Sequence, residues 1–219
     1  MTTLFAENGF ALASIDFRQS TDARFPAQIY DIKGAIRFLR AEAQTYGYRT
    51  DRIAIAGRSS GGHLAALVGV TNGNKELEGA VGGHLEQSSD VQAIVDYFGA
   101  SNLTTIMAQS TPFGVELRGP ALALLLGKPV GDAEALARLA SPVTHVDSGD
   151  PPLLLLHGDQ DPQMPINQAH ELQGAYEQHG LDVFLDVVHG AAHGGDAFFI
   201  GEALQRVVAF LRRTIAPSS

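Results

Sequence analysis

The sequence predicts an α/β fold, in which a doubly wound and mostly parallel sheet carries helices on both faces. Short apolar runs rich in β-branched residues alternate along the chain with longer segments whose apolar residues recur at helical spacing. In addition, a serine framed by glycines at residues 57–61 lies between one such run and the next helical segment. Strands that alternate with helices imply parallel strands joined by helical crossovers.

The expected elements follow one another in this alternating order. We expect strands at Phe10–Asp16, Arg52–Ala56, Val91–Phe98, Pro152–Leu156 and Val183–Val188. We expect helices at Pro26–Tyr46, Gly62–Val70, Ile166–His179 and Glu202–Ile215. The apolar residues of the first and last of these helices fall on one face, as they do in a helix that packs on a sheet.

Residues 101–141 interrupt the alternation. They contain helical patches at Ala121–Leu126 and Glu134–Leu139, but no strand. One interpretation is a helical insertion that covers the carboxyl edge of the sheet near the active site, and the other is an ordinary connecting pair of helices. Since the chain has neither a low-complexity linker nor an internal repeat, we expect residues 1–219 to form a single domain.

Composition narrows the range of functions. The net charge is -9, only 18% of the residues are charged, and no basic stripe is present, so nucleic acid is not an expected partner and anionic polymers are disfavoured as substrates. No apolar stretch approaches the roughly 20 residues of a membrane span. There is no cysteine, which excludes disulfides, thiolate metal sites and a cysteine nucleophile. Met1–Glu7 lacks the features of a signal peptide, and the compartment stays open.

The serine at position 59 is the leading candidate for chemistry. The apolar strand at Arg52–Ala56 leads into Gly57-Arg58-Ser59-Ser60-Gly61, and a helix of small residues follows. This context places a nucleophilic serine on a tight turn between strand and helix, and we expect Gly57 and Gly61 to avoid Cβ clashes there. The Ser60 backbone N–H, at the start of the helix, can stabilise an oxyanion. The alternative is a glycine-rich turn with a capping serine.

Partners for this serine follow two later strands. Asp159 and Asp161 come after Pro152–Leu156, whereas His189 and His193 come after Val183–Val188. Because useful groups collect beyond the carboxyl ends of parallel strands, a serine, a carboxylate and a histidine can meet at this edge. A serine nucleophile needs such a base and a carboxylate that orients it. The order Ser, Asp, His is that of the α/β hydrolases.

Further segments carry a resemblance to a known family. They are Phe17-Arg18-Gln19-Ser20, Phe25-Pro26-Ala27-Gln28, Asp51-Arg52-Ile53, His84-Leu85-Glu86-Gln87-Ser88-Ser89, Ser141-Pro142-Val143, His157-Gly158-Asp159-Gln160-Asp161 and Gly190-Ala191-Ala192-His193-Gly194. With the serine motif, they make the chain similar to the esterase/lipase branch of the α/β-hydrolase superfamily, and most similar to feruloyl and acetylxylan esterases. The resemblance covers nearly the whole chain, and it is more specific for the superfamily than for the substrate.

The resemblance assigns roles to individual residues. It implies that Ser59 is the nucleophile, Asp161 the acid and His193 the base, with the Ser60 N–H in the oxyanion hole. Asp159 lies two residues early and more plausibly caps the turn.

The remaining histidines have no catalytic role in this comparison. His189 is expected at the surface or in a pocket, His157 at a structural strand end, and His63 in packing or hydrogen bonding. A metal site made of His84, His189 and His193 has no supporting ligand spacing, so we expect no metal and no cofactor.

One departure from the family concerns the start of the sequence. Members of this branch carry a His-Gly-Gly-type loop after their third strand, which supplies part of the oxyanion hole, whereas the present sequence begins at the helix that follows it. The fold is therefore expected to be N-terminally shortened. Without the third strand, Phe10–Asp16 must pair with Arg52–Ala56 or leave an apolar edge open, so we expect a rearranged edge or a homo-oligomer that covers it.

These observations predict a serine hydrolase that cleaves carboxylic esters of small molecules through an acyl-enzyme. Short-chain acyl, acetyl or feruloyl-type esters are the expected substrates. Two alternatives stay open: an amidase, formamidase or peptidase that uses the same triad, and a truncated, weakly active protein that retains the fold and binds a ligand.

Overall fold

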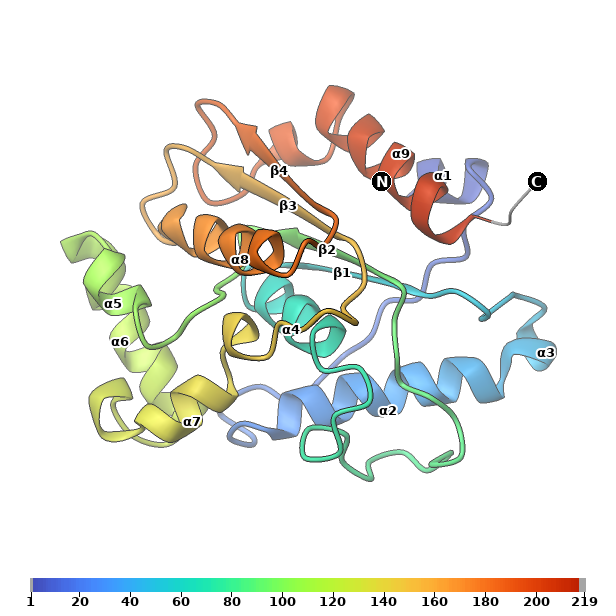
Figure 1. Cartoon of the computed structure of the whole chain (residues 1–219), viewed down its shortest axis with the longest axis horizontal. Coiled ribbons are helices and arrows are strands. Elements are labelled where there is room, and N and C mark those ends of the chain that lie inside the picture. The colour runs from blue at the N-terminus through green and yellow to red at the C-terminus, as the bar shows by residue number, and fades with distance from the viewer. Residues whose placement is uncertain (1, 217–219) are drawn as a thin grey trace.

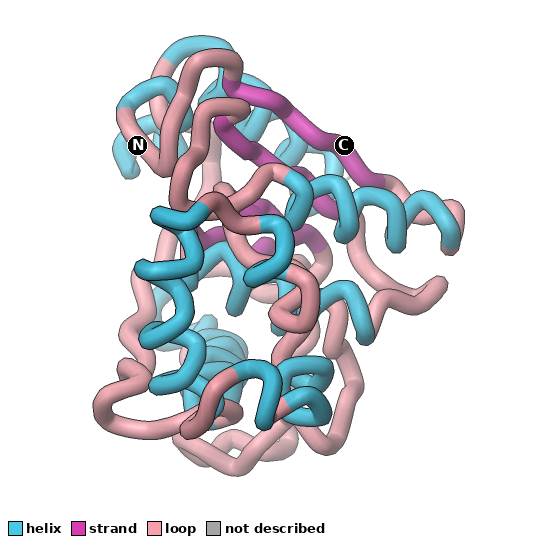
Figure 2. The backbone as a smooth tube through the Cα atoms, turned by 90° about the vertical axis from the view of Figure 1, so that its left-hand side faces the viewer, coloured by secondary structure: helices cyan, strands magenta, loops and turns pink. Residues whose placement is uncertain are grey.

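The computed structural model describes residues 2–216, and it contains a parallel sheet of four strands in the order β1-β2-β3-β4. The strands are β1 (Ala54–Arg58), β2 (Ala93–Tyr97), β3 (Leu153–Gly158) and β4 (Val183–Val188). Every neighbouring pair is parallel. This architecture confirms the predicted α/β fold, with helices above and below the strands (Figures 1 and 2).

The helices connect and flank these strands. They are α1 (Thr2–Glu7), α2 (Ala27–Ala41), α3 (Ala43–Tyr46), α4 (Ser60–Gly69), α5 (Ile106–Gln109), α6 (Pro112–Leu126), α7 (Glu134–Leu139), α8 (Asn167–Gln178) and α9 (Gly201–Ile215). Three short 3₁₀ turns cover Val130–Asp132, Pro142–Thr144 and Asp196–Phe198. None of the helices in the described part of the chain combines the length and the apolar character needed to cross a bilayer.

Alternation along the strands divides the core between the two faces of the sheet. Val95 and Leu154 pack in a cluster with residues of α9, whereas Ile94, Leu153 and Leu155 pack in a cluster with residues of α4 and α8. All residues of β2 and β3 are buried, as expected for strands covered on both faces. The central strands therefore form a rigid base whose carboxyl ends carry the candidate site.

The segment Phe10–Asp16 is not a strand, so this prediction was wrong. Phe10 packs against the cluster on the α9 face, whereas Ile15 and Phe17 pack against the cluster formed with α2 and α4. The segment thus crosses from one face of the sheet to the other instead of pairing with β1. Leu12, midway along it, is 57% exposed. As a result, β1 has no hydrogen-bonded strand on its outer side within residues 2–216.

The long helix expected at Pro26–Tyr46 is divided in two. The backbone leaves helical geometry at Glu42 (φ -93°, ψ 8°), and the second piece, α3, ends at Gly47 in the left-handed conformation (φ 73°). The first piece, α2, buries Ile29, Ile32 and Ile36 on one face, as its spacing predicts.

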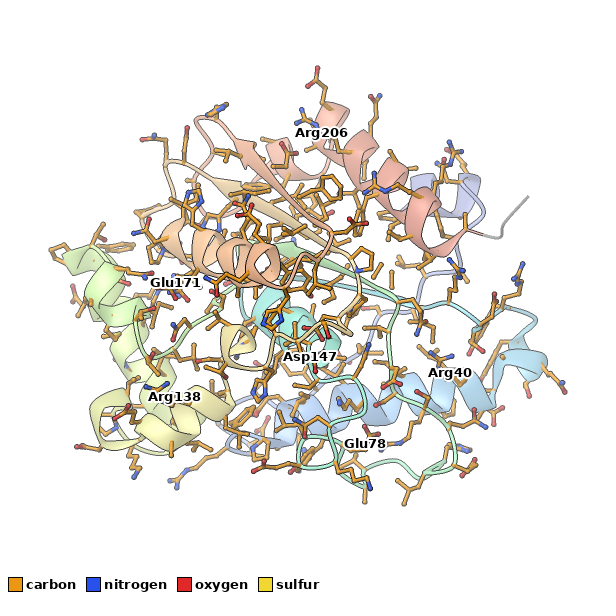
Figure 3. The ribbon with its side chains drawn as sticks, viewed as in Figure 1. Arg40, Glu78, Arg138, Asp147, Glu171 and Arg206 are labelled. Atoms are coloured by element: carbon orange, nitrogen blue, oxygen red, sulfur yellow. The ribbon has the colours of Figure 1, made fainter. Side chains whose placement is uncertain are left out.

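Charged groups on α2 anchor the long loop between α4 and β2. The buried Lys33 ammonium donates to the Thr71 carbonyl at 2.7 Å and lies 3.5 Å from the Glu78 carboxylate. The buried Arg37 guanidinium pairs with the same carboxylate and donates to the Val81 carbonyl at 2.7 Å. Glu78, labelled in Figure 3, therefore neutralises two buried cations at once.

Candidate active site

Ser59 lies on a strained turn between β1 and α4. Its backbone angles are φ 53° and ψ -117°, a region that residues with a side chain rarely occupy. The Ser59 N–H donates to the Tyr97 carbonyl at 2.9 Å, and the Ser59 carbonyl accepts from the His63 N–H at 3.0 Å. These two bonds connect the turn to β2 and to α4, and so hold the strained conformation in place.

The close approach of strand and helix explains one of the two motif glycines. A Cβ on Gly57 would collide with the carbonyl group of Gly61. A Cβ on Gly61 would meet nothing within 4 Å, so the expectation that Gly61 also avoids a clash was wrong. The second crowded position is instead Gly62, where a Cβ would collide with the Asp96 carboxylate.

The structure brings together the three residues singled out in the sequence. His193 Nε2 lies 2.8 Å from Ser59 Oγ, and His193 Nδ1 lies 2.6 Å from Asp161 Oδ2. The other carboxylate oxygen of Asp161 accepts from the backbone N–H groups of Gln163 and Met164, each at 2.8 Å. The Asp161 side chain is fully buried, and that of His193 is 11% exposed. With a neutral imidazole, the Ser59 hydroxyl donates to Nε2 and Nδ1–H donates to the carboxylate.

The surroundings of Asp161 keep it ionised. Burial by itself would raise the pKa of this carboxyl, but the hydrogen bonds from His193 and from two backbone N–H groups hold the pKa below its usual value. His157 lies 3.6 Å from the same carboxylate, and its Nε2 lies 3.0 Å from the Met164 carbonyl. Burial lowers the pKa of His157, so the ring is neutral and donates to that carbonyl.

An aromatic wall supports the imidazole of His193. The Phe98 and His193 rings meet in an edge-to-face arrangement with centroids 4.8 Å apart, and the Phe198 ring packs in the same manner against Phe98, also at 4.8 Å. Phe98 has a positive φ of 44°, which turns its side chain at the end of β2. Sequence reasoning missed this contact, although an aromatic residue at the carboxyl end of the predicted strand Val91–Phe98 was a signal that could have found it.

Asp159 and His189 form a second carboxylate–imidazole pair, next to the first in sequence. Asp159 accepts from the Gly190 N–H at 2.8 Å and lies 2.8 Å from His189 Nδ1. The His189 side chain is 83% exposed, which agrees with its expected surface position. The pair fastens the loop after β4, which carries His193, to the loop after β3.

Two further histidines, His63 and His84, lie outside the hydrogen bonds that join Ser59, His193 and Asp161, although His63 lines the cavity beside them. His63 is buried, and its Nε2 lies 2.7 Å from the Ala140 carbonyl. Burial lowers its pKa. His84 faces Glu86 at 3.8 Å. In residues 2–216, no group of three or more histidine, aspartate or glutamate side chains is arranged to hold a metal ion.

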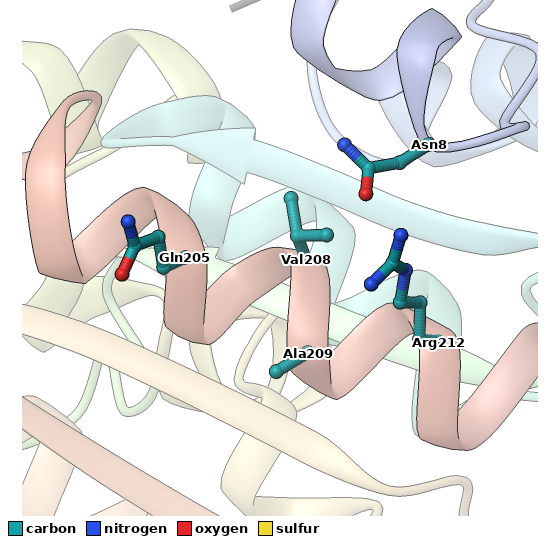
Figure 4. A pocket seen from close by; sticks show the side chains of 5 residues that line it. All are labelled: Asn8, Gln205, Val208, Ala209 and Arg212. Carbon is teal, nitrogen blue, oxygen red and sulfur yellow. The ribbon is translucent and has the colours of Figure 1, made fainter.

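A cavity of about 270 Å³ opens beside Ser59 and His193. Its apolar walls come from α4, α5 and α6 and the loops before them; they include Leu64, Leu103, Ile106, Leu122 and Leu125. Its polar lining includes Ser60, the first residue of α4, together with Gln28 and Arg118. Helices of the segment 101–141 thus enclose the space next to the serine. Another hollow lies between α1 and α9, away from the site (Figure 4).

Comparison with known proteins shows the family of this chain. The BD-FAE family matches residues 1–176. The chain is 33% identical over 165 residues to the probable carboxylic ester hydrolase LipM of Mycobacterium tuberculosis, covering 75% of this chain and 37% of LipM. It is 30% identical over 215 residues to esterase LipC of the same organism, covering 92% of this chain and 52% of LipC. It therefore spans about half the length, or less, of these curated relatives.

Among solved structures, the chain resembles a truncated form of a carbohydrate esterase from gut microbiota. The TM-score is 0.86 and the sequence identity is 34%, over 94% of this chain and 75% of the other. A likeness of this extent places the four-stranded sheet and its helices within the α/β-hydrolase fold.

Proposed function

Since the chain belongs to the BD-FAE family, we propose that it is a serine hydrolase that cleaves carboxylic esters of small molecules. The observation that carries this proposal is the position of His193, which bridges the Ser59 hydroxyl and the buried Asp161 carboxylate next to a cavity. The strained turn that carries the serine and the esterases among the relatives support it.

In the proposed reaction, Ser59 Oγ attacks the ester carbonyl carbon while His193 Nε2 takes the hydroxyl proton. Asp161 holds the imidazole in the required tautomer and stabilises the imidazolium that forms. The tetrahedral oxyanion accepts a hydrogen bond from the Ser60 N–H. Collapse of this intermediate breaks the bond to the alcohol, which leaves with the proton from His193. Water, deprotonated by the same imidazole, then releases the acid and restores Ser59.

We propose short-chain acyl esters, acetyl esters foremost, as the substrates, and feruloyl-type esters, whose acyl group is aromatic and larger, as a further group. A cavity of about 270 Å³ with apolar walls suits a small acyl group. The similar solved structure is that of a carbohydrate esterase, which supports a sugar as the alcohol part.

The test is hydrolysis of 4-nitrophenyl acetate by the wild type and by Ser59→Ala. Loss of the nucleophile is expected to lower the rate at least about 10³-fold, because the triad acts as a unit. Ser148→Ala, in an exposed loop, is the matched control and should keep the wild-type rate. Equal rates for the wild type and Ser59→Ala would refute the proposal. Comparison with 4-nitroacetanilide distinguishes an esterase from an amidase.

A further inference from the structure

Arg118 is a cation in the wall of the cavity that contains Ser59 and His193. It lies on α6, beside Leu117, Ala121 and Leu122, which line the same cavity. Its guanidinium forms no hydrogen bond or ion pair with a side chain of residues 5–216 or with the backbone of residues 2–216, and its Nε is buried without a partner. A partly buried guanidinium without such a partner is unusual, because partial burial of a charge is costly unless a partner compensates it.

The negative charge of Asp161 stabilises the charge of Arg118 electrostatically, but the two side chains form neither a hydrogen bond nor an ion pair. Burial lowers the pKa of Arg118, and the charge of Asp161 opposes that shift. The oxygens of Asp161 are already occupied, since one accepts two backbone N–H groups and the other faces His193. The N–H groups of Arg118 are therefore left for a group that enters the cavity.

The cavity lining differs in charge from the rest of the molecule. The chain carries a net charge of -9, yet the described residues that line this cavity include two arginines and no aspartate or glutamate. The other arginine, Arg18, is engaged in a two-pronged pair with Asp31, with distances of 2.7 and 2.8 Å. Arg118 is thus the cation of this lining that has donors to spare. The expectation that anionic polymers are disfavoured as substrates rests on the net charge of the whole chain and does not extend to a small anion in this cavity.

We propose that Arg118 binds a carboxylate carried by the substrate, so that the preferred substrates are esters that also bear a free carboxyl group. A guanidinium and a carboxylate match in a planar, two-pronged geometry, which fixes orientation as well as adding affinity. This assignment rests on the proposed ester hydrolysis, because it names the substrate class of the same site. The cavity volume of about 270 Å³ keeps the carboxylate and the scissile ester within one small molecule.

The test uses two matched pairs of esters that differ in one charge. Methyl hydrogen succinate and methyl succinamate place a carboxylate or an amide on the acyl side, and 4-acetoxybenzoate and 4-acetoxybenzamide place them on the alcohol side. The expected result is a kcat/KM about tenfold or more higher for the anionic member of at least one pair. Arg118→Gln should bring this ratio to about one, and Arg118→Lys should retain part of it.

The control is Arg138→Gln on α7, an exposed arginine paired with Glu134 and labelled in Figure 3, which should keep the wild-type ratio. The proposal is overturned if the wild type cleaves the neutral esters without preferring either anionic one. It is also overturned if Arg118→Gln slows all four esters equally, which a purely structural role would produce.

A binding experiment distinguishes failure of this inference from failure of the proposed ester hydrolysis. If no ester is cleaved, calorimetry with succinate and succinamide still tests Arg118. Succinate bound by the wild type and lost in Arg118→Gln upholds the assignment, whereas equal binding of both compounds overturns it.

Discussion

Asp96 is a buried residue of β2, the neighbour of β1, and β1 leads into the turn that carries Ser59. It lies opposite Gly57 in the register of β2 and β1 and is 2% exposed. Its Oδ1 accepts from the Gly99 N–H at 2.8 Å. Burial raises the pKa of Asp96 to about 7, and the hydrogen bond from Gly99 opposes this shift. The folded protein therefore retains a proton that the unfolded chain releases at lower pH.

This linkage predicts how stability depends on pH. From a pKa of 3.8 in the unfolded chain to about 7 in the folded state, the folded protein binds more protons, so the contribution of Asp96 to stability falls as pH rises across that window. The free energy of unfolding of the wild type minus that of Asp96→Asn should be highest below pH 4. This difference should fall by a few kcal/mol between pH 4 and pH 8. Urea denaturation at pH 4 to 8 measures the difference. Parallel curves for the two proteins would contradict the prediction.

Among single residues, those that directly follow the predicted strands could be recognised from the sequence. Ser59, Asp161 and His193 could be paired beforehand because parallel strands bring their carboxyl ends to one edge. Arg118 could not be placed in the same way, and the position of Phe98 at the end of a predicted strand was only part of the signal for its contact. The contact of Phe98 with His193 depends on a backbone turn with φ 44°, and the position of Arg118 depends on how α6 packs, which no periodic pattern specified.

The candidate site depends on the turn between β1 and α4. Its two motif glycines differ in the room that a Cβ atom would have, so their alanine variants should differ in stability. In Gly57→Ala, the new Cβ would collide with backbone atoms of α4, so strand and helix must move apart. We expect a loss of stability of about 1–3 kcal/mol together with loss of ester hydrolysis. Gly61→Ala meets open space and should retain stability or gain up to about 1 kcal/mol. Thermal denaturation of both variants checks the contrast, and equal destabilisation would contradict it.

The elements predicted from the sequence differ in how much they depend on distant partners. The runs that became β2 and β3 are mostly apolar, with Asp96 in one and His157 in the other, and they are buried on both faces, so their own composition indicated strands. The segment Phe10–Asp16 has a similar local pattern, but a strand also needs a neighbour in register. Here its apolar residues pack on opposite faces of the sheet, which no local pattern reveals.

For the whole molecule, the outer side of β1 is one of the two open edges of the described sheet, the other being that of β4. Ala56 on this strand is exposed, and within the described chain no strand pairs with that side. Because open edges favour pairing between chains, we predict self-association in solution, measured as molar mass by light scattering after size-exclusion chromatography. Ala56→Lys should shift the protein towards the monomer, since a charge on an edge strand opposes pairing. A monomeric wild type at all concentrations would contradict the prediction.

The hydrogen bond between Ser59 and His193 joins residues 134 positions apart. During synthesis on the ribosome, the serine emerges long before the histidine that the proposed reaction requires. Until β4 docks against β3, the nascent chain carries an ordinary alcohol at position 59, however well the first helices have formed. Hydrolytic competence would thus arrive only with the last strand of the sheet, and the emerging polypeptide would be inert towards esters around it.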